Sequence, residues 1–152
     1  MEKFVVFRLG GEEFGISINR VTEILRSQKI NPLPELPYFL SGVITLRGSV
    51  IPLMDMRKRF SLASSPKNER IIVVKSEGDK IGLIVDEVKE IIFLKEDEIT
   101  NPPSIFKGLR TEYLTGIGRK ESKVIILLNL DGLLTTEEKI ALKESEDSRV
   151  EA

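Results

Sequence analysis

The chain has 152 residues, of which 41% are hydrophobic and 31% charged, and its formal net charge is −1. This balance is typical of a single globular domain, and it gives no net positive charge to attract nucleic acid or an anionic membrane. The absence of cysteine and histidine excludes a disulfide framework, a thiolate metal site and the commonest general base. No apolar run approaches the roughly 18 residues of a membrane span, and the N-terminal residues lack the apolar core of a signal peptide. We therefore expect a cytoplasmic protein without direct membrane insertion, and an enzyme is the less favoured interpretation.

Two segments of the chain repeat one pattern. Residues 5–25 (VVFRLGGEEFGISINRVTEIL) align without a gap on residues 72–92 (IVVKSEGDKIGLIVDEVKEII), at a constant offset of 67. Farther along, VIPLMDM at 50–56 is echoed by VIILLNL. We interpret residues 1–142 as a single domain that arose by tandem duplication, with unit one at about 1–66 and unit two at about 67–134.

Each unit is predicted to open with two apolar strands that flank a glycine-containing turn, GGEE in unit one and SEGDK in unit two. Apolar residues then recur at helical spacing and predict a short amphipathic helix in each unit; they are Val21, Ile24 and Leu25, then Val88, Ile91 and Ile92. Asn19 and Asp86 occupy the expected N-cap positions. A proline-rich connection and two more strands complete each unit, and so many short strands in about 65 residues indicate a small barrel. Because one such barrel would be marginally stable, we expect the two to pack together.

The stretch GVITLRGSVIPLMDM (42–56) is predicted to be a hairpin with its turn at Gly48-Ser49. Alternation then places one face in the barrel interior, made of Ile44, Leu46, Ile51 and Leu53. The opposite face, made of Val43, Thr45, Arg47, Val50, Pro52 and Met54, is too apolar for water and should pack on the second barrel or receive a partner. Pro52 predicts an edge strand or an open ladder position. Arg47 has two interpretations that are compatible: an ion pair with Glu23, or an anchor for a partner.

After the second unit, Thr135 and Glu138 have the spacing of a capping box and predict a C-terminal helix over about residues 135–142. Residues 143–152 have little to bury and are expected to form a flexible tail. The globular part is therefore expected to end near Leu142.

Several of these stretches together resemble the CheW-like coupling proteins of bacterial chemotaxis. GVITLRGSVIPLMDMRKRF looks like the signature of the first half of that family, and EYLTGIG followed by VIILLNLDGLL (112–134) resembles the signature of the second half. GLIVDEVKEII and the proline-rich loop before Gly42 match as well. The similarity covers nearly the whole chain in the expected order, with no flanking receiver or kinase segment, so the chain resembles the free-standing adaptor.

The resemblance implies a mainly β fold of two intertwined five-stranded SH3-like barrels with short helices. It implies a scaffold without catalysis and without a cofactor, which couples the cytoplasmic tip of chemotaxis receptors to the regulatory domain of the histidine kinase CheA. Such an adaptor is cytoplasmic and is recruited to membrane-associated receptor arrays. Kinase contact in the family involves a barrel end of the second unit, to which no residue is assigned.

The resemblance also assigns candidate binding residues. Receptor binding in the family uses a groove between the barrels, and the matching apolar positions are Val5, Ile18, Val21, Ile24 and Val88. Glu23, Gly42 and Arg47 match family positions tied to coupling. Taken singly, each of the five apolar residues is better explained by an ordinary place in the core, and Val21 and Ile24 are the ones most expected to be partly exposed.

Three alternatives stay open from the residues alone. Small β-barrels often bind nucleic acid through stacked aromatic residues on a basic face, but aromatic residues are only 6% here and are not interleaved with Lys or Arg on any strand. The basic run RKRF (57–60) is more typical of a solvated helix face. The acidic run Glu96-Asp97-Glu98 could hold Mg²⁺ in an enzyme, although a solvated loop is the simpler interpretation, since nothing glycine-rich nearby would cradle a phosphate. Another kind of protein-interaction module also remains an alternative.

Overall fold

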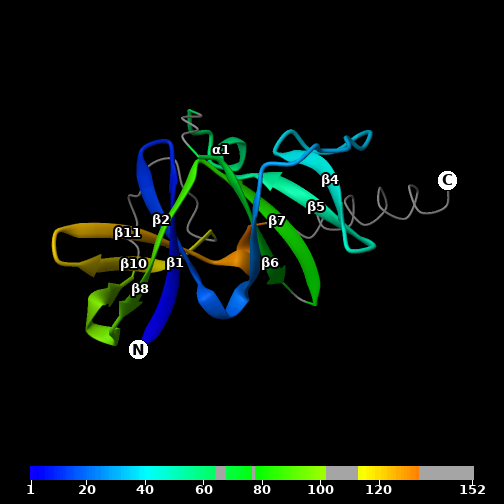
Figure 1. Cartoon of the computed structure of the whole chain (residues 1–152). Helices are drawn as coiled ribbons and strands as arrows, with labels where there is room; N and C mark the ends of the chain where they lie inside the picture. The colour runs from blue at the N-terminus through cyan, green and yellow to red at the C-terminus, as the bar shows by residue number, and fades with distance from the viewer. Residues whose placement is uncertain (64–67, 77, 102–112, 134–152) are drawn as a thin grey trace.

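The computed structural model describes residues 1–63, 68–76, 78–101 and 113–133 (Figure 1). Its strands are β1 (Glu2–Leu9), β2 (Glu12–Ser17), β3 (Val21–Arg26), β4 (Leu40–Leu46), β5 (Ser49–Asp55), β6 (Arg70–Ser76), β7 (Asp79–Val85), β8 (Glu87–Leu94), β9 (Ile99–Thr100), β10 (Leu114–Lys120) and β11 (Lys123–Leu128). Short helical turns are η1 (Ile18–Arg20), α1 (Met56–Arg59), η2 (Glu96–Glu98) and η4 (Leu130–Gly132). The fold is therefore mainly β, as predicted. The predicted C-terminal helix and tail lie outside the described residues.

The strands form two sheets that exchange hairpins. One is six-stranded in the order β8-β1-β2-β11-β10-β9, and the other is five-stranded in the order β3-β6-β7-β5-β4. The β1–β2 hairpin of unit one therefore lies among the strands of unit two, and the β6–β7 hairpin of unit two lies among the strands of unit one (Figure 1). In each sheet a parallel pair joins the two units, β2 with β11 and β7 with β5.

Equivalent strands make equivalent pairs. Val5 of β1 lies opposite Ile91 of β8. Ile72 of β6, which follows Val5 by the repeat offset, lies opposite Ile24 of β3. This repeated pairing confirms the predicted intertwined, SH3-like architecture. Among the described strands no ladder joins the outer strands of either sheet, so neither barrel is closed by backbone hydrogen bonds.

Three apolar clusters fill the molecule. Each sheet curves around an interior of its own, centred on Val6 and Leu127 in the six-stranded sheet and on Leu53 and Val73 in the five-stranded sheet. Between the sheets lies a larger shared core, to which Phe7, Phe14, Met54, Ile72 and Leu83 contribute. An aromatic series runs through it from Phe7 to Phe14, Phe60 and Tyr113, with ring centroids 6.0, 5.7 and 5.4 Å apart. The expectation that the two units pack together is confirmed.

The predicted amphipathic helices at Val21–Leu25 and Val88–Ile92 are wrong, because both segments are strands. A β-bulge at Thr22, and the equivalent one at Lys89, inserts one residue without a cross-strand partner. Val21 and Ile24 therefore lie on the same face although they are three residues apart, and Leu25 points to the other face, into the barrel interior. A bulged strand with apolar residues on both faces thus reproduces the spacing of a helix.

The predicted N-caps are wrong for the same reason. Asn19 lies inside the 3-10 turn η1, and Asp86 is fully buried between β7 and β8.

The hairpin of β4 and β5 turns one residue earlier than predicted. Leu46 pairs with Ser49, so the turn residues are Arg47 and Gly48, with φ of 49° and 83°. Positive φ at both central residues is typical of a type I′ turn, which Asn-Gly signals and Arg-Gly does not. The pairing shifts by an even number of residues, so the predicted interior face is still right. Ile44, Leu46, Ile51 and Leu53 all lie in or against the core of the five-stranded sheet.

The opposite face of this hairpin is divided between core and surface. Val43 and Met54 are fully buried, and Met54 belongs to the shared core, as predicted for a face that packs on the second barrel. Thr45 and Val50, near the turn, are exposed. β5 is an interior strand, so the edge-strand prediction for Pro52 is wrong, but its ladder to β7 begins only at Leu53. Pro52 thus precedes that ladder, which matches the alternative prediction of an open position.

Gly42 and Gly48 offer a matched test of this packing, since both have positive φ, 136° and 83°. A Cβ at Gly42 would lie 2.3 Å from the Asn31 carbonyl oxygen, whereas nothing lies within 4 Å of one at Gly48. We expect Gly48→Ala to lower the free energy of unfolding by about 1 kcal/mol, from backbone strain alone. Gly42→Ala should cost about 3 kcal/mol, because overpacking adds to the strain. Urea unfolding of both variants measures the difference, and equal losses would contradict the assigned role of the Asn31 contact.

Candidate functional site

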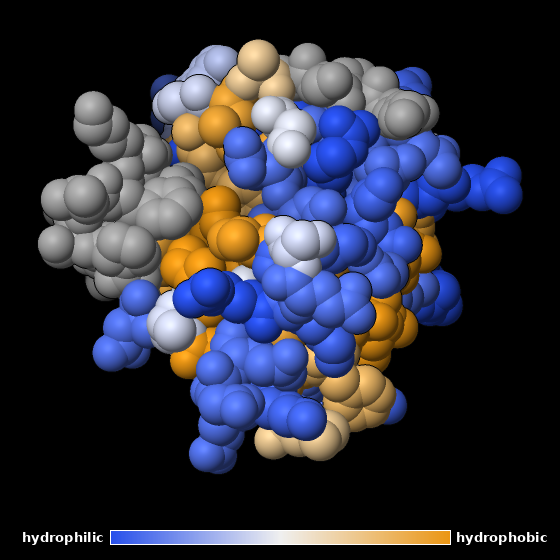
Figure 2. All heavy atoms as spheres, turned by 90° about the vertical axis from the view of Figure 1, so that its left-hand side faces the viewer, coloured by the Kyte–Doolittle hydropathy of each residue, from blue (hydrophilic) through white to orange (hydrophobic). Residues whose placement is uncertain are grey.

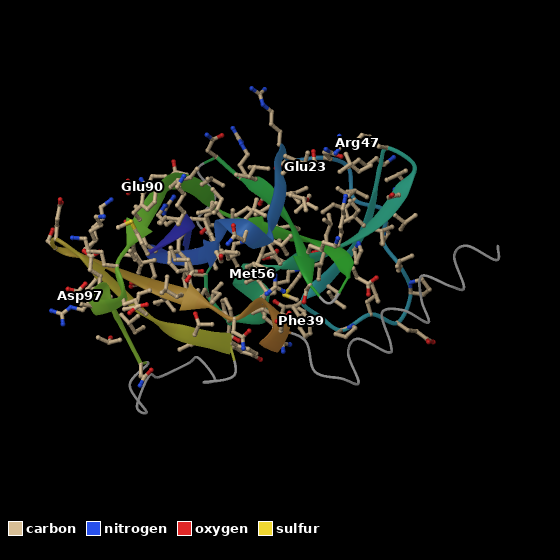
Figure 3. All side chains as sticks on the ribbon, turned by 90° about the horizontal axis from the view of Figure 1, so that it is seen from below. Glu23, Phe39, Arg47, Met56, Glu90 and Asp97 are labelled. Atoms are coloured by element: carbon tan, nitrogen blue, oxygen red, sulfur yellow. The ribbon has the colours of Figure 1, made fainter. Side chains whose placement is uncertain are left out.

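Arg47 forms an ion pair with Glu23, as one of its two interpretations predicted. Its Nη2 donates to Glu23 Oε1, which links the turn of the β4–β5 hairpin to the outer strand β3 (Figure 3). The Arg47 side chain is 69% exposed and that of Glu23 only 24%. The carboxylate therefore holds one side of the guanidinium while most of it faces solvent.

The six-stranded sheet has a counterpart of this ion pair. Glu90, the repeat equivalent of Glu23, accepts a hydrogen bond from Lys123 Nζ at the start of β11. This hydrogen bond raises the pKa of Lys123 above its ordinary value. The turn between β10 and β11 also has a residue with positive φ, Glu121 at 58°, where the other hairpin has Arg47. The two barrels thus differ in which residue supplies the cation, and only the first places an arginine at the turn.

The five apolar candidates lie in or beside the shared core. Val5 is 2% exposed and belongs to the core itself, so its side chain does not reach the surface. Ile18, Val21 and Val88 are half-buried and pack against that core. Ile24 is 43% exposed. The structure thus brings four candidates together in or against one cluster and leaves Ile24 at its margin.

Sequence reasoning missed Ile91 as a surface residue. It is the repeat equivalent of Ile24 and is 58% exposed. It belongs to β8 and lies opposite the core residue Val5 of β1. Glu23 and Glu90, which mark β3 and β8, lie along the same side of the molecule in Figure 3, whereas Phe39 and Met56 lie toward the other. We call Ile18, Val21, Ile24, Val88 and Ile91 the edge-strand surface. The repeat itself could have identified Ile91, because it aligns with Ile24.

Gly42 is not a surface residue. It is buried at a bulge of β4, where the backbone of Asn31 approaches it closely. Asn31 and Val43 exchange two backbone hydrogen bonds, of 2.9 and 2.8 Å, beside it. Gly42 therefore holds the loop before β4 against the strand.

A buried ion cluster forms around Arg57, which contradicts the expectation that the RKRF run is a solvated helix face. Its guanidinium lies 2.9 Å from Asp55 Oδ1, 3.0 Å from Asp86 Oδ1 and 2.8 Å from Glu69 Oε2. Asp86 also accepts a 2.9 Å hydrogen bond from the backbone N–H of Gly10. The hydrogen bond to Asp55 is the main cause of the raised pKa of Arg57, and it outweighs the effect of burial. These partners tie α1, the β1–β2 turn and the β7–β8 junction together.

The two alternative sites gain no support. Within the described ranges, no group of three or more acidic residues is placed to hold a metal ion, and Glu98 accepts a hydrogen bond from the backbone of Lys95. Basic and aromatic residues do meet around α1, which the sequence reading missed: Arg59 lies 4.1 Å from the ring centroid of Phe39 and 4.9 Å from that of Tyr113. Those rings are already covered by a cation and do not form a free stacking platform for bases.

Apolar side chains also reach the outer surface. Among the described residues, the large exposed ones beyond Ile24 and Ile91 are Met1, Tyr38, Val50, Phe93 and Val124. On the face drawn in Figure 2, apolar patches interrupt an otherwise hydrophilic surface. In the part of the chain that the structure describes, no helix has the length and apolarity needed to cross a membrane.

An exposed arginine held at a turn and apolar side chains on outer strands are typical of a β-domain that contacts another protein. Its similarity to known proteins assigns it to a family. The family model described as "CheW-like domain" matches residues 3–138. The chain therefore belongs to the CheW-like family, whose members are non-enzymatic adaptor proteins of chemotaxis signalling.

Individual relatives agree with this assignment. The chemotaxis protein CheW of Klebsiella aerogenes is 34% identical over 139 residues, which cover 90% of this chain and 84% of the relative. The CheW of Bacillus subtilis is 31% identical, with 90% and 88% covered. The crystal structure of a scaffolding CheW protein from Thermoanaerobacter tengcongensis superposes with a TM-score of 0.84, at 38% identity and 90% coverage of each chain.

Removal of the central cation tests the buried ion cluster. Arg57→Met should leave the carboxylates buried without their cation, and we expect it to lower the free energy of unfolding by about 3–5 kcal/mol. Arg47→Met, the control, removes an exposed pair and should cost less than about 1 kcal/mol. Urea unfolding followed by far-UV circular dichroism measures both, and a loss below about 1 kcal/mol for Arg57→Met would be incompatible with a stabilising cluster.

Proposed function

We propose that this adaptor couples the cytoplasmic tip of chemotaxis receptors to the regulatory domain of CheA, and that the edge-strand surface with Arg47 is its receptor site. The observation that carries the proposal is the Glu23–Arg47 pair, which holds a mostly exposed guanidinium at the outer strand β3, the strand that also exposes Ile24. Family membership supports the same pair of partners. The protein would reach membrane-associated arrays through the receptors, without inserting into the membrane itself.

The chemistry of this surface suits a helical partner. Apolar residues on two outer strands offer a surface on which the apolar face of a helix can be buried. Arginine is enriched among residues that dominate interface energies, and Glu23 reduces the conformational freedom that Arg47 would otherwise lose on binding. The guanidinium has five N–H donors, and its exposed part can donate to a carboxylate or a carbonyl of the partner.

The remaining candidates have supporting roles in this proposal. Val5 underlies the surface from the shared core, and Ile18, Val21 and Val88 are half-buried between core and partner. Gly42 shapes the loop that precedes the hairpin of Arg47, through its contact with Asn31. A substitution at Val5 or Gly42 would therefore weaken binding by altering the protein's shape.

We place the kinase contact at the end of the six-stranded sheet. The β10–β11 hairpin exposes 58% of Val124 there, and Phe93 of β8 is 45% exposed. Lys120 Nζ donates to the Phe93 carbonyl oxygen at 2.6 Å, so both residues belong to the same end of the sheet. Phe93 and Ile91 lie on the same face of β8, so the two proposed surfaces adjoin along this strand.

Two exposed residues test the receptor site without disturbing the core. We expect Ile24→Asp and Arg47→Ala each to weaken binding of a chemoreceptor cytoplasmic fragment at least tenfold in co-sedimentation, since one buries a charge and the other removes an interface anchor. The half-buried Val21→Asp should do the same, with thermal unfolding as a check that it still folds. Normal receptor binding by both Ile24→Asp and Arg47→Ala would show that the site is misassigned.

The hairpin valine provides the matched control. Val124→Asp changes another exposed apolar residue, on the other barrel, so we expect it to leave receptor binding unchanged and to weaken binding of purified CheA. Ile24→Asp should have the opposite profile. If the unsubstituted chain forms no ternary complex with a receptor fragment and CheA, the proposed function itself is wrong.

A further inference from the structure

The chain crosses between the two sheets at two equivalent places. It passes from β2 to β3 through η1, and from β7 to β8 through Asp86. The repeat offset makes Arg20 the equivalent of Glu87. In the same way, the alignment of Val50 with Val124 makes Arg57, after β5, the equivalent of Asp131, after β11. The β7–β8 crossover contacts Arg57, and the β2–β3 crossover contacts Asp131.

The β7–β8 crossover is fixed by the buried ion cluster, which we call the buried latch. Asp86 is fully buried and contacts both Arg57 and the backbone of Gly10, and its own N–H donates to the carbonyl of Arg8 at 3.1 Å. Asp86 is thus held through both its side chain and its backbone. This crossover is therefore a rigid point of the fold.

The β2–β3 crossover has a second latch with the charges reversed, which we call the exposed latch. Arg20 Nη2 lies 2.7 Å from Asp131 Oδ1, and Ser76 Oγ donates to the same oxygen at 2.8 Å. Arg20 Nε also donates to the Lys75 carbonyl at 2.9 Å. Here the crossover carries the cation and the residue after the last strand carries the anion. The side chains are 34% and 48% exposed, so the attraction is weak compared with that in the buried latch.

We propose that Arg20, through Asp131 and Ser76, is a positioning residue that sets the β2–β3 crossover and with it Ile18 and Val21. The turn η1 has no buried residue and no side-chain cap hydrogen bond, so the Arg20 contacts are its main described polar restraints. Ile18 precedes Arg20 by two residues and Val21 follows it directly, and both are half-buried at the margin of the shared core. The structural part stands alone; the effect on receptor binding rests on the proposed function.

A loosened exposed latch should raise local opening of the crossover without unfolding the protein. An exposed pair contributes up to about 1 kcal/mol, so we expect about two- to fivefold faster amide exchange over residues 18–21 in Asp131→Asn. Exchange in β1 and β7 should be unchanged. The control Lys123→Gln breaks an ion pair of similar exposure on the other barrel and should not alter exchange at residues 18–21.

A double variant with the two charges exchanged tests whether the ion pair can be restored. Arg20→Glu with Asp131→Arg exchanges the two charges of the pair, so that an ion pair still joins the crossover to η4. We expect this double variant to exchange within twofold of the unsubstituted chain, and Arg20→Glu alone to exchange at least as fast as Asp131→Asn. Unchanged exchange in Asp131→Asn, or an equal increase in Lys123→Gln, would overturn the latch.

Binding of a chemoreceptor cytoplasmic fragment supplies the functional readout. We expect Asp131→Asn to weaken it about two- to fivefold at unchanged melting temperature, and the double variant to restore it. Faster exchange with unchanged affinity would overturn the positioning role. If the unsubstituted chain does not bind the fragment, the proposed function fails, while the exchange measurement still decides whether the exposed latch restrains the crossover.

Discussion

The exchange of hairpins between the sheets is the constraint on which the rest of the molecule depends. Because β1 and β2 complete the sheet of unit two, and β6 and β7 that of unit one, the chain must cross between sheets after β2 and after β7. The inner faces of the exchanged hairpins then form a large part of the shared core, including Phe7, Phe14, Ile72 and Leu83. β3 and β8 become outer strands for the same reason. The surface proposed for the receptor is thus the margin of the shared core, where the exchanged strands end.

Charge is distributed according to how firmly each junction must be held. Arg57 is buried beside three carboxylates, and removal of this arginine would leave the buried Asp55 and Asp86 without their cation. Arg47 and Arg20 each rely on one principal carboxylate and keep a substantial exposed fraction. An arginine therefore stabilises the fold at one position, whereas at another position an arginine remains exposed and available for contact with a partner. The burial of the arginine and the number of its carboxylate partners distinguish these roles. Neither property can be predicted from a local sequence such as RKRF.

Much of the fold could be predicted because it follows from periodicity and repetition. The gapless alignment of residues 5–25 with 72–92 anticipated equivalent strands, and alternation located the interior face of the β4–β5 hairpin correctly. The failures have local causes. The bulge at Thr22 gave a strand the spacing of a helix, and an arginine with positive φ moved the turn by one residue.

The candidate site was predictable only in part. The Glu23–Arg47 pair could be anticipated because Glu23 was the one well-placed acidic residue upstream of Arg47. The exposure of Ile91 follows from its equivalence to Ile24 in the repeat. The burial of Val5 and the cluster around Arg57 could not. Both depend on strands that are distant in sequence, such as the approach of Asp86 to Arg57, and no local pattern encodes that approach.

The crossed arrangement also determines how the protein can be divided. Each unit alone carries a hairpin whose partner strands belong to the other unit, and further strands, three in unit one and four described in unit two, whose hairpin is elsewhere. A polypeptide cut between the units therefore yields two pieces, and neither piece contains all the strands of either sheet. The pieces can reach the native arrangement only by associating, each supplying two strands to the sheet of the other. Although the sequence reads as two modules in series, the smallest folding unit is the whole pair.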